Sequence, residues 1–160
     1  PSFFTLSANG KYLYAVEEIG SDVDEAGRVV AYRRADDHLE KINQQPTFAF
    51  APCHVSTDSK SRYVFVANYV GVIAVYPVAA NGGLEAATFH EAFQGKGPHS
   101  RQDAPHPHSV NLSPDEQYLY VPDLGTDNIY TYKINYDSPQ KPLTKSVLLP
   151  SVIVSGTMPR

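Results

Sequence analysis

The segment 99–108 concentrates side chains that can hold an anion and move a proton. It contains three of the six histidines of the chain, together with Arg101 and Gln102. An imidazole has an ordinary pKa of about 6.5, so it can accept or donate a proton near neutral pH. A guanidinium stays charged and can bind a carboxylate or phosphate through two parallel hydrogen bonds. The segment therefore indicates acid–base chemistry on an anionic small molecule.

His108 is the strongest candidate for the proton-transfer group. It follows Pro107 at the start of an expected strand, and we predict that it acts there as a general base or acid. The alternative is a histidine that only bonds a carbonyl of a neighbouring strand. We expect His106 to turn away from the side that His108 occupies. This argues against a metal site, and His106 remains a candidate substrate-binding residue.

Two other sets of residues also allow simpler interpretations. His54 follows Cys53, and alternation along a strand predicts that the two side chains face apart, so a Cys/His nucleophilic pair is not expected and His54 is interpreted as a packing residue. Arg101 and Gln102 lie in a loop, where the arginine either binds an anionic group or is a solvated surface charge. We predict no cofactor.

Composition excludes several classes of function. The chain has 160 residues, a net charge of -4 and no cluster of Lys and Arg, which argues against nucleic-acid binding. No apolar run reaches the ~18 residues that span a bilayer, so we expect no membrane segment. The single Cys53 excludes an internal disulfide and fits a cytoplasmic location. Because the chain begins at Pro1 and ends in mid-pattern at Arg160, we expect a piece of a longer protein.

A repeat of 51 to 55 residues organises the whole chain. Each unit opens with a proline and carries a tyrosine eleven positions later in the complete copies, at Tyr12, Tyr63 and Tyr118. The opening prolines predict repeats at 1–51, 52–106 and 107–158, with the next unit beginning at 159.

Each repeat is predicted to contain four strands and no helix. Short runs of β-branched and aromatic residues predict the strands, and the 13 prolines argue against helices. The expected first, second and third strands are 2–6, 12–16 and 28–32 in the first repeat, 53–57, 63–67 and 72–76 in the second, and 108–112, 118–121 and 128–132 in the third. Weaker fourth strands are expected at 47–50, 88–93 and 145–149.

These units predict an all-β fold, a β-propeller of four-stranded antiparallel blades. The second strands are continuously apolar, which indicates burial on both faces, whereas a β-sandwich would show clearer alternation. We therefore expect blade-to-blade packing to bury Phe65, Val66, Val75, Tyr76, Val121 and Tyr132. Three blades do not close a ring, so the chain is predicted to cover about three blades of a larger propeller.

The blade geometry assigns a set of positions to one rim. The start of a first strand and the end of a second strand share that rim, which places Ser2, Cys53, His108 and Arg160 beside Glu17, Asn68 and Asp123. The opening prolines are constant while the next residue varies in chemistry, as expected where a fixed scaffold carries function. Asp123 is first of all a turn residue, and it is also a candidate substrate-binding residue.

The sequence resembles the seven-bladed propeller lactonases, a family that includes propeller-type 6-phosphogluconolactonases and carboxymuconate lactonizing enzymes. The resemblance covers the whole chain. It is carried by Pro52-Cys53-His54-Val55-Ser56, Val66-Ala67-Asn68-Tyr69, Arg101-Gln102, Pro105-His106-Pro107-His108-Ser109-Val110, Ser113-Pro114-Asp115 and Val121-Pro122-Asp123-Leu124-Gly125-Thr126-Asp127.

The resemblance implies seven blades in all, and it implies catalytic roles for His108 and Arg160. Arg160 would be the arginine that opens the next blade, although the segment Gly156-Thr157-Met158-Pro159-Arg160 lacks the second glycine of the family pattern. Arg101 and Gln102 match an Arg-Gln pair of the family. The acidic partner that the family uses would lie beyond the end of this chain.

Three functions follow from this reading. The first is hydrolysis of a sugar lactone, with His108 as base and the arginines binding anionic groups. The second is the reverse type of chemistry, lactonization of a carboxylated muconate. The third is a non-catalytic propeller whose rim binds a protein. For either enzyme the expected partner is an anionic lactone or a dicarboxylate.

Overall fold

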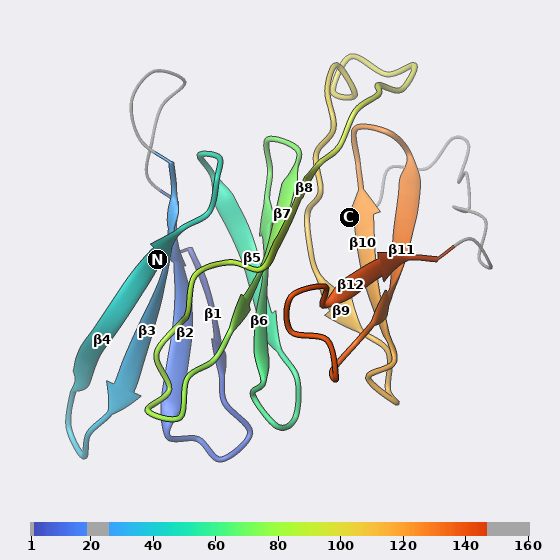
Figure 1. Ribbon diagram of the computed structural model, residues 1–160. Helices are drawn as coiled ribbons and strands as arrows, with labels where there is room; N and C mark the ends of the chain where they lie inside the picture. Colours follow the sequence, from blue (N-terminus) through green and yellow to red (C-terminus); the bar gives the residue numbers. More distant parts are fainter. Residues whose placement is uncertain (1, 19–25, 147–160) are drawn as a thin grey trace.

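A computed structural model describes residues 2–18 and 26–146, in which twelve strands and no helix form three four-stranded antiparallel sheets (Figure 1). The strands follow the chain across each sheet, so each sheet is one blade. The first blade consists of β1 (Phe3–Leu6), β2 (Tyr12–Glu17), β3 (Arg28–Arg34) and β4 (Leu39–Pro46). The second consists of β5 (Pro52–Thr57), β6 (Tyr63–Asn68), β7 (Val72–Pro77) and β8 (Phe89–Ala92). The third consists of β9 (Asn111–Leu112), β10 (Tyr118–Asp123), β11 (Asn128–Ile134) and β12 (Leu143–Lys145).

The turn between the first two strands explains why the repeated tyrosine keeps its register. In every blade, a polar side chain five residues before the tyrosine accepts a hydrogen bond from the tyrosine N–H. The acceptors are Ser7 Oγ at 2.9 Å, Asp58 Oδ2 at 2.9 Å and Ser113 Oγ at 3.0 Å. Such side-chain bonds close a turn locally and fix where the second strand begins.

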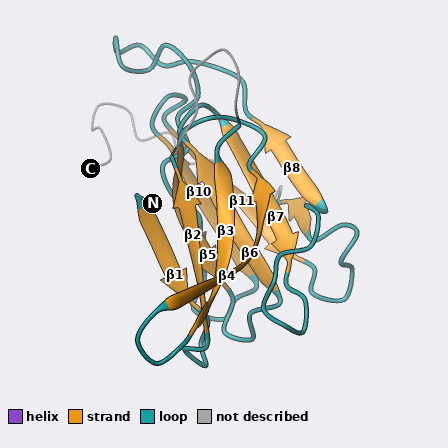
Figure 2. Ribbon diagram, turned by 90° about the vertical axis from the view of Figure 1, so that its left-hand side faces the viewer, coloured by secondary structure: helices purple, strands orange, loops and turns teal. Residues whose placement is uncertain are grey.

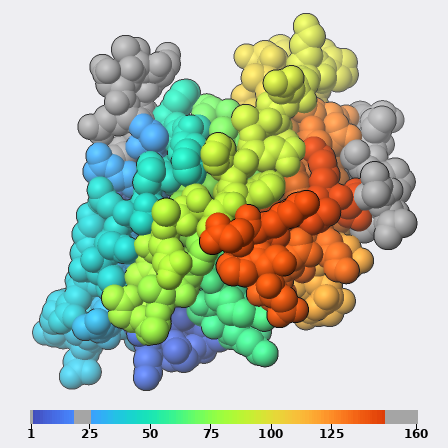
Figure 3. Space-filling view, viewed as in Figure 1, coloured from blue at the N-terminus to red at the C-terminus, as the bar shows by residue number. Residues whose placement is uncertain are grey.

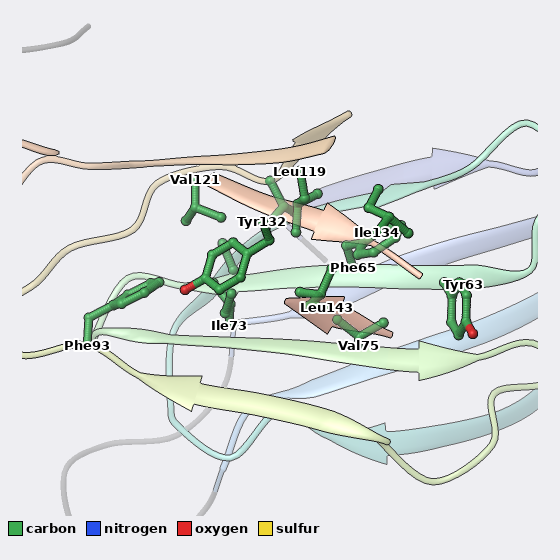
Figure 4. Close-up of a cluster of buried hydrophobic side chains, with 12 residues drawn as sticks. Tyr63, Phe65, Ile73, Val75, Phe93, Leu119, Val121, Tyr132, Ile134 and Leu143 are labelled. Atoms are coloured by element: carbon green, nitrogen blue, oxygen red, sulfur yellow. The ribbon is translucent and has the colours of Figure 1, made fainter. Parts of the chain in front are cut away.

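The blades stack face to face and bury two apolar clusters (Figures 1 and 2). One cluster lies between the first and second blades and the other between the second and third, where Phe65, Val75 and Tyr132 meet (Figure 4). The expected burial of six blade residues is confirmed. Each has an exposed fraction of at most 1%: Phe65, Val66, Val75, Tyr76, Val121 and Tyr132. The all-β propeller prediction is thus borne out in the described chain.

The outer strands differ most from the prediction. The fourth strand of the first blade is β4, not 47–50, and residues 47–51 form a link in which Phe48 and Ala51 have positive φ. β4 is the outer strand of its sheet and pairs with β3 alone. Its sequence, Leu-Glu-Lys-Ile-Asn-Gln-Gln-Pro, is mostly polar and lacks the apolar pattern of a buried strand. In the third blade, β12 begins at Leu143, and residues 147–149 of the predicted strand lie outside the described residues.

Among the described second strands, only that of the middle blade is buried along its whole length. All six residues of β6 are buried, whereas β10 alternates between buried and partly exposed residues. On the opposite side of the described chain, Phe3, Phe4 and Leu6 of β1 are exposed. The reason is that β6 packs between two blades, while β1 and β10 each belong to a blade with a neighbour on one side.

Candidate functional site

His108 lies at the rim where the third blade begins. Its N–H donates to Pro122 O at 3.0 Å, and Leu124 N–H donates to His106 O at 3.0 Å, so two backbone bonds join this segment to the end of β10. The segment is not a regular strand: the structure gives β9 only two residues, and a single bridge pairs Pro107 with Asp123. The His108 side chain is exposed. A ligand at the rim therefore has access to its imidazole.

A β-bulge in the second blade holds the backbone on either side of His108. Pro52 pairs with Asn68 but His54 pairs with Ala67, so Cys53 is the extra residue. As a result Cys53 and His54 both face the third blade. Cys53 Sγ lies 3.6 Å from Pro107 O and 3.7 Å from His108 O, and Val110 N–H donates to His54 Nδ1 at 3.3 Å. The prediction that these two side chains face apart is wrong, because alternation is lost at a bulge.

The thiol of Cys53 is not suited to be a nucleophile. Burial, and to a lesser extent the charge of Glu18, raise the pKa of Cys53 to about 11. The protonated thiol is surrounded by carbonyl oxygens, including Ala67 O at 3.6 Å. A thiol is a weak nucleophile compared with a thiolate, so Cys53 acts here as a weak donor to the backbone.

His54 is held in the neutral form. Burial, with the nearby imidazole of His108 as a second cause, lowers the pKa of His54. Because Nδ1 accepts the bond from Val110, the proton of the neutral ring is on Nε2. The ring also contacts Phe3 of the first blade, with centroids 4.4 Å apart. His54 thus joins the inner strands of all three blades beside His108, in agreement with its interpretation as a packing residue.

Tyr69 connects the two histidines of the rim. Its ring is stacked on His106, with centroids 4.4 Å apart and planes 13° apart, and it meets His108 edge-on at 5.7 Å and 87°. The prediction that His106 turns away from the side of His108 is wrong, because both rings contact this one tyrosine. Strand geometry gives the same result, because residues two apart share a face in a regular strand.

His106 is committed to contacts within the protein. Its Nδ1 lies 3.0 Å from Tyr69 O, and its Nε2 lies 3.3 Å from Asp103 Oδ1. The hydrogen bond from His106, the largest of several causes, lowers the pKa of the exposed Asp103. With one ring face on Tyr69 and both nitrogens occupied, His106 is better placed to support the rim than to bind substrate.

Asp123 organises the loop that carries the paired histidines. It is 1% exposed, and its Oδ1 accepts from the N–H groups of His106 at 2.6 Å, Gly125 at 2.8 Å and Thr126 at 3.3 Å. A buried carboxylate with this set of donors holds backbone in place. Its position therefore corresponds to support of the loop and not to direct contact with a substrate.

Gln102 has a similar supporting position, which leaves Arg101 as the outward group. Gln102 is 4% exposed; its Nε2 donates to Leu124 O at 2.9 Å and its Oε1 accepts from His99 N–H at 3.0 Å. Arg101, the next residue, is exposed. The loop projects beyond the strand ends, in yellow at the top of Figures 1 and 3. Gln102 thus anchors a loop that presents the guanidinium of Arg101 to solvent.

The predicted site residues accordingly divide into two kinds. His108 and Arg101 are exposed, while Gln102 and Asp123 are buried supports and His106 is a partly buried one. Arg160 lies outside the described residues. Sequence reasoning missed Tyr69 as a site residue, although its place directly after the rim position of Asn68 was a usable signal. Over 2–18 and 26–146, no group of three or more His, Cys, Asp or Glu side chains could hold a metal ion, and no helix could cross a membrane.

Comparison with known proteins agrees with this geometry. The family model for the seven-bladed β-propeller lactonases matches residues 1–160. The chain is 36% identical to the 6-phosphogluconolactonase of Bacillus subtilis over 137 residues, covering 84% of this chain and 38% of that protein. It is 35% identical to the 6-phosphogluconolactonase of Formosa agariphila over 144 residues, covering 87% of this chain and 40% of that protein.

Solved structures give the same result. A putative 6-phosphogluconolactonase from Bacteroides fragilis has a TM-score of 0.83 and 36% identity, covering 91% of this chain and 42% of that one. The periplasmic gluconolactonase of Pseudomonas aeruginosa has a TM-score of 0.84 and 38% identity, covering 90% of this chain and 42% of that one. The chain belongs to the seven-bladed β-propeller lactonase family. It spans about two fifths of the length of these relatives.

Proposed function

We propose that the full-length protein is a lactonase that opens sugar lactones, with phosphorylated gluconolactones as its main substrate class. The observation that carries the proposal is the exposed imidazole of His108, fixed at the rim in a chain that is 36% identical to a 6-phosphogluconolactonase. A lactone is an activated ester, so its hydrolysis needs a placed water, a base and positive charge near the carbonyl oxygen.

His108 is the base in this proposal. Its imidazole takes a proton from water while the water oxygen bonds to the lactone carbonyl carbon, which gives a tetrahedral oxyanion. Cleavage of the bond to the ring oxygen then releases an alkoxide, which takes the proton back from the imidazolium. The product is the open hydroxy acid, and the enzyme returns to its initial state. The bulge at Cys53 and His54 supports this role, because it holds the backbone of residues 107–110.

Two arginines supply the positive charge. We assign Arg160, from the next blade, to the carbonyl oxygen as it becomes an anion. We assign Arg101 to the remote phosphate or carboxylate of the substrate. This assignment is supported by the exposed position of Arg101 on a loop that Gln102 anchors through hydrogen bonds to Leu124 and His99. No cofactor takes part. A cytoplasmic location remains a prediction, and the similar gluconolactonase of Pseudomonas aeruginosa is described as periplasmic.

The proposal is tested with the full-length protein on 6-phosphogluconolactone, unphosphorylated gluconolactone and carboxymuconate. We expect hydrolysis of both lactones and no lactonization of the muconate. Arg101→Ala should lower kcat/KM for the phosphorylated lactone by about 10- to 100-fold, since a charged hydrogen bond is lost, and should change the value for the neutral lactone little. Arg33→Ala is the matched control, because Arg33 is an exposed cation at the far end of the first blade.

Three results would contradict parts of the proposal. Conversion of carboxymuconate without lactone hydrolysis would indicate the lactonizing reaction. Inactivity of the folded wild-type protein on all three compounds would favour a non-catalytic binding module. An equal loss on the phosphorylated and neutral lactones in Arg101→Ala would remove the anion-binding role of Arg101 and leave the lactonase proposal in place.

A further inference from the structure

Two hydrogen bonds fix the backbone of Tyr69 at the rim beside His108. Its N–H donates to Ala51 O at 2.9 Å, and its carbonyl oxygen lies 3.0 Å from His106 Nδ1. Two residues later, Gly71 has φ 92°, and a Cβ atom at Gly71 would lie 3.4 Å from Pro105 Cβ. A tight turn of the second blade is therefore packed on the loop that leads to the histidines.

The ring of Tyr69 is also held, but its hydroxyl is not. His106 covers one face of the ring at 4.4 Å, and His108 meets the ring edge-on at 5.7 Å. Within residues 2–18 and 26–146 the Tyr69 hydroxyl has no hydrogen-bond partner, and it is not one of the buried oxygens that lack a partner there. The hydroxyls of two other tyrosines are used internally: Tyr76 donates to Pro46 O at 2.8 Å and Tyr132 to Glu91 Oε2 at 2.9 Å.

We propose that Tyr69 is a specificity-determining residue whose hydroxyl hydrogen-bonds a ring hydroxyl of a lactone held at His108. A phenol both donates and accepts, so it can pair with a sugar hydroxyl in either sense. The stacking of His106 holds the Tyr69 ring in place before substrate binds, so less side-chain conformational entropy is lost on binding. Tyr69 thereby favours polyhydroxylated lactones over lactones without ring hydroxyls. This inference rests on the proposed lactonase function.

The alternative role of Tyr69 is packing alone. A packing tyrosine would contribute through its ring, and its hydroxyl would be without consequence. The two roles separate in Tyr69→Phe, because this substitution keeps the ring that touches His106 and His108 and removes only the oxygen. A site that hydrogen-bonds a substrate hydroxyl loses selectivity when its partner is removed.

The test compares glucono-δ-lactone with δ-valerolactone, which has the same ring and no hydroxyls, using full-length wild-type protein and Tyr69→Phe. We expect kcat/KM for gluconolactone to fall about 3- to 10-fold, the scale of one hydrogen bond, with valerolactone unchanged. Tyr118→Phe is the control, since Tyr118 begins β10 at the other end of the third blade, and it should leave both values unchanged. Thermal melting checks that both variants fold.

Equal kcat/KM values in wild type and Tyr69→Phe for both lactones would overturn the inference, and so would an equal loss for both. In either case the wild-type activity would still support the proposed lactonase function. A folded wild-type protein that hydrolyses 6-phosphogluconolactone but neither of these two lactones would overturn this inference alone. Inactivity on 6-phosphogluconolactone as well would overturn the proposed function, and this inference with it.

Discussion

The chemistry of the rim depends on which side chains are exposed and which are used as supports. His108 and Arg101 are exposed, whereas Gln102 and one carboxylate oxygen of Asp123, Oδ1, hydrogen-bond the backbone of the rim. Residue type alone does not distinguish these roles, because a carboxylate or an amide can bind a substrate or close a loop. The sequence therefore predicts a set of neighbouring residues at one rim, but it does not separate the exposed side chains from the supporting ones.

His54 should make stability depend on pH. Its pKa is lowered in the folded protein, mainly by burial, so between that value and the ordinary pKa of about 6.5 the unfolded chain binds more protons. Stability then rises with pH through this interval and falls as the solution is acidified below about pH 6.5. Urea denaturation of the full-length protein measures the effect at pH values from about 5 to 7.5, a range around the ordinary histidine pKa.

His54→Asn is the variant for that experiment, since its amide oxygen can still accept the Val110 N–H. We expect the variant to lose the part of the pH dependence that lies just below the ordinary histidine pKa. His38→Asn, at an exposed site in the first blade, is the control. An unchanged pH profile in His54→Asn would show that His54 does not titrate differently on folding.

The second and third strands could be predicted from sequence, whereas the outer strand of the first blade, the start of the third blade and the irregular segments could not. Strands such as β6 and β7 are apolar on both faces, and the proline-to-tyrosine spacing places them. β4 is polar because it is an outer edge, so its composition resembles that of a loop. The bulge at Cys53 has no marker in the sequence, yet it turns two adjacent side chains toward one blade.

The turn after β10 shows how closely these irregular segments pack. A Cβ atom at Gly125 would lie 1.7 Å from Ala104 O and 2.8 Å from Pro105 Cα, both of which are backbone atoms. Gly125→Ala must therefore displace the loop or the turn. We expect it to cost about 1 to 3 kcal/mol of stability, the usual scale of overpacking, and to lower lactonase activity by moving the segment 104–108.

Chemical denaturation together with kcat/KM measures this effect in the full-length protein. Gly83→Ala is the control, because the atoms nearest to its added Cβ belong to side chains, at 3.1 to 3.4 Å, and can move. Wild-type stability and activity in Gly125→Ala would mean that the loop is not held against the turn as described.

At the scale of the whole molecule, the rim site requires neighbouring blades. His108 belongs to the third blade, but Cys53, His54 and Tyr69, which hold its surroundings, belong to the second. The tight packing of the two blades through Phe65, Val75 and Tyr132 fixes this relation. The family match to a seven-bladed propeller fits the exposed apolar residues of β1, because a further blade could pack against them.

The most direct test is the turnover of 6-phosphogluconolactone by full-length wild-type protein, His108→Ala and His90→Ala. His90 is the control because it is an exposed histidine on β8, the outer strand of the second blade, where it is stacked on Phe48. If the imidazole of His108 transfers the proton, His108→Ala should lower kcat by roughly 100-fold or more, with His90→Ala unchanged. An unchanged kcat in a correctly folded His108→Ala variant would contradict the account.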